Sequence, residues 1–321
     1  MVSRRSVIWR LIVSLALTSC GTFSADVLTP SGQTQDTPVP ILSPSVQTET
    51  PQPIASPTAA PDYVQQIRNA QYQLSLPDSL QIVQLTDGKF EQGTAGGPDF
   101  VSVFVTDFVA RGDLNGDNED EIAALISENY GGTGTFVFLV IYADIDGKLT
   151  FQTSKLVDDR PQLNALFIED QEIFLEAIIH GSEDPMCCPT LKTTRHFRFV
   201  DGQLDMIDYT TFTPDGRPRT ITITSPPSGT TTYSSVQIRG EVAIAPFENN
   251  LVYRIYDVGG VELSSGAISV TAPDLGAPGT FDAVIPIGTV LSGAVIRIEV
   301  QDISAADGSL FAMDSVELVV Q

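Results

Sequence analysis

Hydrophobic and polar residues alternate along most of the C-terminal hundred residues, which predicts β-strands. In residues 294–300, for example, aliphatic residues at every second position alternate with Arg297 and Glu299. One face of each strand is then apolar and the other polar, as a sandwich of two sheets requires. Seven such strands, separated by turn residues, are expected at 221–224, 235–244, 251–257, 261–270, 279–285, 294–300 and 313–320.

The residues before 210 also favour strands, after one short helix. Asp62 is a suitable cap for a helix that runs to about Tyr72. The sequence therefore predicts a mainly β protein, with a β-rich (α+β) domain at 63–210, a linker at 211–220 and the sandwich at 221–321. Strands of the first domain are expected at 81–85, 100–108, 121–126, 135–143, 149–156, 163–169, 172–180 and 194–200.

The N-terminus has the pattern of an export signal. Residues 1–20 carry three arginines, all within the first ten positions, and no acid. The apolar run 11–17 follows the arginines. Leu17-Thr18-Ser19-Cys20 resembles the lipobox of bacterial lipoproteins, which implies a lipoprotein signal peptide at 1–20 and lipidation of Cys20. The protein would then be extracytoplasmic and lipid-anchored to the cell membrane or outer membrane. An ordinary secretion signal or an N-terminal membrane anchor is the alternative. Residues 21–62, rich in Pro, Thr and Ser, are expected to be a disordered linker.

The net charge of the chain limits the classes of partner that it can bind. Of 321 residues, 17 are Lys or Arg and 40 are Asp or Glu, a net charge of −23. So acidic a chain is not expected to bind nucleic acid, because phosphate binding needs clustered cations. Only two histidines and three cysteines offer themselves for metal or nucleophile chemistry.

One acidic loop has the spacing of a calcium site. Candidate oxygen ligands lie at alternate positions, and calcium prefers six to eight oxygens. The loop is not an EF-hand, which would need Gly at position 118 and Glu at position 124. It resembles the loop-then-strand calcium motif of FG-GAP-type β repeats, with Asn118 in place of glycine. The alternative is an acidic turn closed by its own side chains without an ion. The candidate ligands are Asp113, Asn115, Asp117, Glu119 and Glu121.

Cys187 and Cys188 are adjacent, and adjacent cysteines can pair only in a strained eight-membered ring. A vicinal disulfide or two buried thiols that shape a loop are the simplest interpretations. Zinc binding with His180 and His196, or a redox role, are the others. Together with the loop at 112–117 and the turn at 129–134, this segment resembles an uncharacterised extracytoplasmic module with no known activity.

The C-terminal segment contains a series of short turn and packing motifs: Ile223-Thr224-Ser225-Pro226-Pro227, Arg239-Gly240-Glu241, Phe247-Glu248-Asn249-Asn250, Tyr256-Asp257 with Gly259-Gly260, Phe281 and Asp307-Gly308. Together they resemble the Gmad2-type immunoglobulin-like domain of bacterial spore germination proteins, over about 221–321. The resemblance implies a seven-stranded immunoglobulin-like sandwich and carries no catalytic residues.

These features favour a non-catalytic binding or structural protein of the cell envelope. Its partners would be the membrane, through the lipid, and an envelope protein or glycan. No catalytic residue is predicted, and Ca²⁺ is the one cofactor that the sequence suggests. The alternative is an extracytoplasmic hydrolase or a redox or metal sensor in the 63–210 domain. A hydrolase would need a nucleophile, a base and an oxyanion site within mutual reach.

Overall fold

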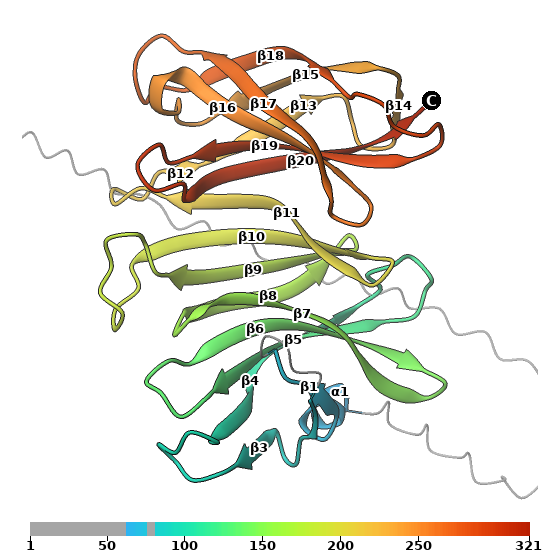
Figure 1. Ribbon diagram of the computed structural model, residues 1–321, viewed down its shortest axis with the longest axis vertical. Helices are drawn as coiled ribbons and strands as arrows, with labels where there is room; N and C mark the ends of the chain where they lie inside the picture. Colours follow the sequence, from blue (N-terminus) through green and yellow to red (C-terminus); the bar gives the residue numbers. More distant parts are fainter. Residues whose placement is uncertain (1–61, 76–80) are drawn as a thin grey trace, which may run out of the picture. The chain divides into compact units, whose positions relative to one another are not determined.

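The computed structural model describes residues 62–75 and 81–321. The described residues do not include the predicted signal peptide or Cys20. They also leave out residues 21–61 of the linker that is predicted at 21–62. The described chain is mainly β, as the sequence predicts (Figure 1). Within it, no helix combines the length and the hydropathy that crossing a bilayer requires.

The helix α1 (Tyr63–Arg68) begins at Asp62, whose carboxylate accepts a hydrogen bond from the backbone N–H of Val64 at 3.1 Å. The sequence pattern predicts a helix to about Tyr72, and this boundary is wrong. Tyr72 belongs instead to strand β1 (Gln71–Gln73). The side chain of Tyr72 is fully buried between more exposed neighbours, which is the two-residue period of a strand.

The β-rich domain packs two antiparallel groups of strands around a shared core. Strands β3 to β7 form one sheet, and β8 to β11 pair in order beside it. Alternate residues of β5 enter opposite cores: Ile122 packs with α1 and β1, whereas Leu125 packs against β9 and β10. The continuous apolar run at 122–126 follows from this burial on both faces. The strands are β2 (Ile82–Gln84), β3 (Lys89–Gln92), β4 (Val101–Gly112), β5 (Glu121–Asn129), β6 (Phe136–Ile145), β7 (Lys148–Asp159), β8 (Gln162–Glu169), β9 (Glu172–Ile179), β10 (Leu191–Val200) and β11 (Gln203–Phe212).

The C-terminal strands form the predicted sandwich around one aliphatic core. β17 pairs with β16 in one sheet and with β18 in the other, so the two sheets meet along this strand. Gly240 lies under the ring of Phe281, where a Cβ would come within 2.3 Å of the ring. The strands are β12 (Pro218–Arg219), β13 (Ile221–Ser225), β14 (Thr230–Thr232), β15 (Ser235–Val242), β16 (Asn250–Asp257), β17 (Glu262–Thr271), β18 (Gly279–Pro286), β19 (Val295–Ile303) and β20 (Leu310–Val320), with a 3-10 turn, η1 (Phe247–Asn249).

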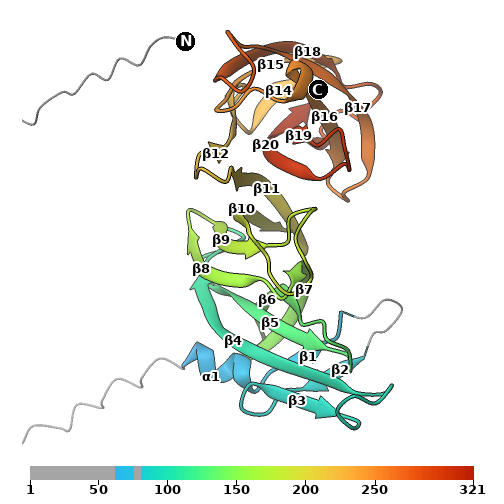
Figure 2. The ribbon, with the colours of Figure 1, turned by 90° about the vertical axis from the view of Figure 1, so that its left-hand side faces the viewer.

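The two domains share a sheet. β11 pairs antiparallel with β20 over residues 208–210 and 312–314 (Figure 2). Two side-chain bonds accompany this pairing: Thr211 donates to the carbonyl of Phe311 at 2.7 Å, and Ser315 donates to that of Ile207 at 2.8 Å. The junction therefore has both backbone and side-chain hydrogen bonds.

A half-buried charge network also crosses the junction. The guanidinium of Arg297, on β19, lies 2.6 Å from a carboxylate oxygen of Asp205, on β11. Lys155 of β7 donates to the carbonyl of Leu204 at 3.1 Å, and burial lowers its pKa. Since the first domain covers this part of β19, Arg297 and Glu299 are buried although they alternate with the core residues.

Candidate functional site

A cleft of about 810 Å³ is formed where the two domains meet. The loop after β9, the turn after β11 and the first residues of β20 border it. Its apolar lining comes from both domains: Ile179, Leu191, Tyr209, Phe212, Leu310 and Phe311. Apolar clefts with a few polar groups at their rim are the usual form of ligand sites.

Two cations cover aromatic rings at this junction. The ammonium of Lys192 lies 4.4 Å from the ring centre of Phe212, and the guanidinium of Arg219 lies 4.7 Å from that of Phe311. Such contacts are worth about 0.5–1 kcal/mol at exposed sites. They orient one aromatic side chain from each domain.

Residues 211–220, predicted as a linker, carry the turn that borders the cleft. Thr211 and Phe212 continue β11 and pair with Arg219 and Pro218. The turn closes at Gly216, with φ at 84°, where glycine is favoured over other residues. Proline and glycine, which suggest a linker, are equally the residues of such a hairpin turn.

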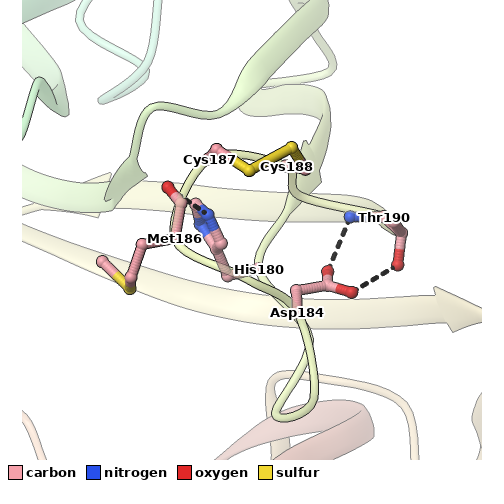
Figure 3. Close-up of a disulfide and its surroundings, with 6 residues drawn as sticks. All are labelled: His180, Asp184, Met186, Cys187, Cys188 and Thr190. Atoms are coloured by element: carbon pink, nitrogen blue, oxygen red, sulfur yellow. Dashed lines mark hydrogen bonds between the residues drawn. A yellow bond between two sulfur atoms is a disulfide. The ribbon is translucent and has the colours of Figure 1, made fainter.

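Cys187 and Cys188 form a disulfide in the loop between β9 and β10 (Figure 3). Both cysteines are exposed. Asp184 holds the two ends of the loop together, because its carboxylate accepts bonds from Gly181 N–H at 2.8 Å, Thr190 N–H at 2.7 Å and Thr190 Oγ1 at 2.8 Å. These bonds, the one from Gly181 first, lower the pKa of Asp184.

His180 connects this loop to the body of the domain. Its Nε2 lies 3.2 Å from the carbonyl oxygen of Met186 (Figure 3). Its Nδ1 lies 3.1 Å from a carboxylate oxygen of Asp158. The contact to Met186 ties the backbone beside Cys187 to the body of the domain.

A second cavity, of about 310 Å³, is polar and lies at the same domain junction. His196, Asp208 and Asp314 follow one another across β10, β11 and β20 as direct cross-strand neighbours. Burial, aided by the charges of Asp314 and Glu172, raises the pKa of Asp208 to about 7. Burial also raises the pKa of Asp314, although its carboxylate accepts bonds from the N–H groups of Ile223 and Ser315.

The acidic loop, whose calcium binding stays a prediction, leads directly into β5, and its side chains close it. Asp113 accepts bonds from the N–H groups of Gly116 at 2.7 Å and Asn118 at 3.0 Å. Asn115 and Asp117 each accept one from the residue two positions on, Asp117 and Glu119 respectively. Asn118 has φ at 70°, as expected of a residue that replaces glycine.

Glu121 closes the other end of the acidic loop. Its side chain is buried and accepts bonds from Leu114 N–H at 2.8 Å and Asn115 Nδ2 at 3.0 Å. Burial raises the pKa of Glu121.

His180 and His196 do not come together. His196 pairs with Phe174, six residues before His180 on β9, a separation of about 20 Å along a strand. Its ring packs on Phe174 at 4.2 Å between centres, and burial lowers its pKa. Within residues 62–75 and 81–321, no group of three or more His, Cys, Asp and Glu side chains is arranged to hold a metal ion.

One family model matches part of the chain, at residues 220–309. It describes the immunoglobulin-like domain of bacterial spore germination, Gmad2. Residues 220–309 form a Gmad2 immunoglobulin-like domain. The match confirms the resemblance based on the turn and packing motifs. No curated protein matches the chain. β20, the strand that pairs with β11, lies beyond the matched residues of the Gmad2 domain.

Both cavities at the junction escape sequence reasoning. Their residues are ordinary strand residues, such as Tyr209, Asp208 and Asp314, and only the pairing of β11 with β20 brings them together. One feature of the sequence points to the polar cavity, namely an aspartate at position 208 and another at position 314, each among apolar strand residues. Burial of a carboxylate in a strand is unfavourable unless the side chain meets a cavity or a hydrogen-bonding partner.

Proposed function

We propose that this protein is a non-catalytic binding protein of the bacterial cell envelope, held at the membrane by a lipid on Cys20. The lipobox-like sequence supports the anchor, and the Gmad2 domain supports a role without catalysis. The partner is an envelope protein or glycan. Calcium at the acidic loop, if bound, stabilises that loop and takes no part in chemistry.

The cleft built by both domains is the observation that carries the binding role. Its floor combines Phe212 of the β-rich domain with Phe311 of the Gmad2 domain. Aromatic rings bind the apolar side chains of a protein or the faces of a sugar ring, while the polar rim orients the partner. The proposed binding surface therefore forms only when the two domains are packed together.

Two charge substitutions separate this cleft from the remaining surface. Leu310→Glu places a carboxylate in the cleft, and Val284→Glu places one on β18 at a residue that is 68% exposed and outside the cleft. The full-length chain is cross-linked in living cells, and its envelope adducts are identified. We expect the wild type and Val284→Glu to form the same adduct and Leu310→Glu to lose it, with unchanged melting temperature. Equal adducts from both variants would contradict binding in the cleft.

The anchor is tested separately by growing cells with a clickable fatty acid. The wild type should carry the label and Cys20→Ser should not. A label that persists on Cys20→Ser would refute lipidation at this cysteine.

A further inference from the structure

The disulfide loop combines three features that bear on thiol exchange. The bond is exposed, it closes a ring between neighbouring residues, and a histidine lies beneath it. Each property comes from a different observation, and the binding role proposed above uses none of them.

Adjacency makes the bond reducible. Disulfides usually join residues whose Cα atoms are 4.4–6.8 Å apart, as a general rule. Cys187 and Cys188 are neighbours in sequence, with Cα atoms 3.8 Å apart. Bridges outside the ordinary range, and exposed ones, have the higher reduction potentials typical of labile or regulatory disulfides.

The loop is held at its ends and open in the middle. Asp184 binds Thr190 across the loop, and Pro189 is buried. Between these points Met186, Cys187 and Cys188 are all exposed, so a thiolate can approach either sulfur. The ends of this loop also line the cleft, through Gly181, Asp184 and Thr190.

His180 fixes the backbone beside the disulfide. Its Nε2 lies 3.2 Å from the carbonyl oxygen of Met186, the residue before Cys187, and its Nδ1 lies 3.1 Å from a carboxylate oxygen of Asp158. These contacts connect the cysteine pair to the body of the domain. His180 is a positioning residue in this account, since it acts through the loop.

We propose that Cys187–Cys188 is a dithiol–disulfide exchange site whose reduction by an external dithiol loosens the wall of the cleft. One thiolate of the dithiol attacks a cysteine sulfur, the bond between the cysteines breaks, and the other cysteine leaves as a thiolate that takes up a proton. The second thiol of the dithiol then attacks the mixed disulfide. Two electrons and two protons pass to the protein, which ends with two thiols, while the dithiol ends as a cyclic disulfide.

The test uses the full chain in detergent, with dithiothreitol as the dithiol. Free thiols are alkylated at intervals, and the peptide that contains Cys187 and Cys188 is weighed. We expect reduction of the wild type to be faster than that of oxidised glutathione under the same conditions. Reduction slower than that of glutathione, or a peptide that is never oxidised, would overturn the proposal.

Two matched histidine variants test the role of His180. His180→Gln should change the rate of reduction, because the backbone beside Cys187 then loses its contact through Met186. His196→Gln, at the other histidine, should leave the rate unchanged. Equal rates in the two variants would refute the role of His180.

Hydrogen exchange measures the effect on the cleft. Reduction should speed exchange of the amides at 181–190 and leave those of β16 unchanged. The double variant Cys187→Ser, Cys188→Ser should show the same faster exchange without any reductant. Exchange that is identical in oxidised, reduced and double-variant protein would overturn the coupling to the cleft.

Discussion

Asp208 and Asp314 lie directly opposite each other where β11 of the first domain pairs with β20 of the Gmad2 domain. Carboxylates in direct cross-strand positions repel each other when both are ionised. The bonds from the N–H groups of Ile223 and Ser315 favour the charge on Asp314, so the proton is held by Asp208. The junction of the domains is therefore sensitive to pH.

Stability should fall as the pH rises from about 4 to about 7. The pKa of Asp208 is raised from 3.8 in the unfolded chain to about 7 in the folded one. The folded protein thus holds the proton more tightly, and the stability it gains is present below pH 4 and lost as the pH passes 7. The full effect is at most about 4 kcal/mol.

Denaturant unfolding of Asp208→Asn across this pH range isolates the effect. The variant should match the wild type near pH 4 and exceed its stability at pH 8. Asp282→Asn removes an exposed charge whose pKa is lowered by bonds from Gln237 and Arg239, and it controls for the overall loss of negative charge. A pH dependence that is the same in wild type and Asp208→Asn would show that Asp208 titrates normally.

Loss of Arg297 should be costly because its side chain and that of its partner Glu299 are buried. Arg297→Met removes the cation from Asp205, at 2.6 Å, and from Glu299, at 3.3 Å. Breaking a buried pair in this way costs about 3–5 kcal/mol. The exposed pair Arg239–Asp282 is the control, since Arg239→Met should cost about 1 kcal/mol or less. If urea unfolding shows equal losses of unfolding free energy in the two variants, the charge network at the junction stabilises the protein no more than an exposed ion pair does.

Asp113 should stabilise the acidic loop without any metal. Asp113→Ala removes the acceptor for the N–H groups of Gly116 and Asn118 and should cost about 1–3 kcal/mol in the presence of a chelator. Thermal unfolding with chelator tests the metal-free turn, and thermal unfolding with millimolar Ca²⁺ tests the calcium site. A calcium site predicts a higher melting temperature for the wild type with Ca²⁺. A stable Asp113→Ala variant in chelator would contradict the turn described here.

Gly240 should tolerate no side chain. A Cβ there would lie 2.2 Å from the carbonyl oxygen of Thr222, on the paired strand β13, and 2.3 Å from the buried ring of Phe281. Gly240→Ala should therefore cost about 1–3 kcal/mol, as overpacking does. Gly132, where a Cβ has nothing within 4 Å, is the matched position for an alanine control. Similar unfolding midpoints for the two variants would disprove this packing.

Local signals predict most of the strands and turns, but not, for example, β1, β3 or β11. The hairpin turns at Asp146-Gly147 and Asp201-Gly202 have positive φ at both residues, which is the conformation this pair of residues favours. The end of α1 was predicted too late because an apolar residue at position 72 fits a helix and a strand alike until its pairing is known.

The junction was beyond reach of local patterns. Thr211 and Phe311 are 100 residues apart in sequence, and no periodicity in either segment specifies the other as its partner. The candidate site shares this limit: Cys187 and Cys188 are visible in the sequence, whereas the cleft beside them exists only through the pairing of β11 with β20.

Calorimetric unfolding of the full chain tests most directly whether the two domains form one unit with a shared cleft. The strand pairing and the ion pair between Arg297 and Asp205 predict one cooperative transition, with equal calorimetric and van't Hoff enthalpies. In Arg297→Met this transition should divide into two. Two separate transitions in the wild type would contradict the account, because they would show that residues 211–220 join domains that unfold independently.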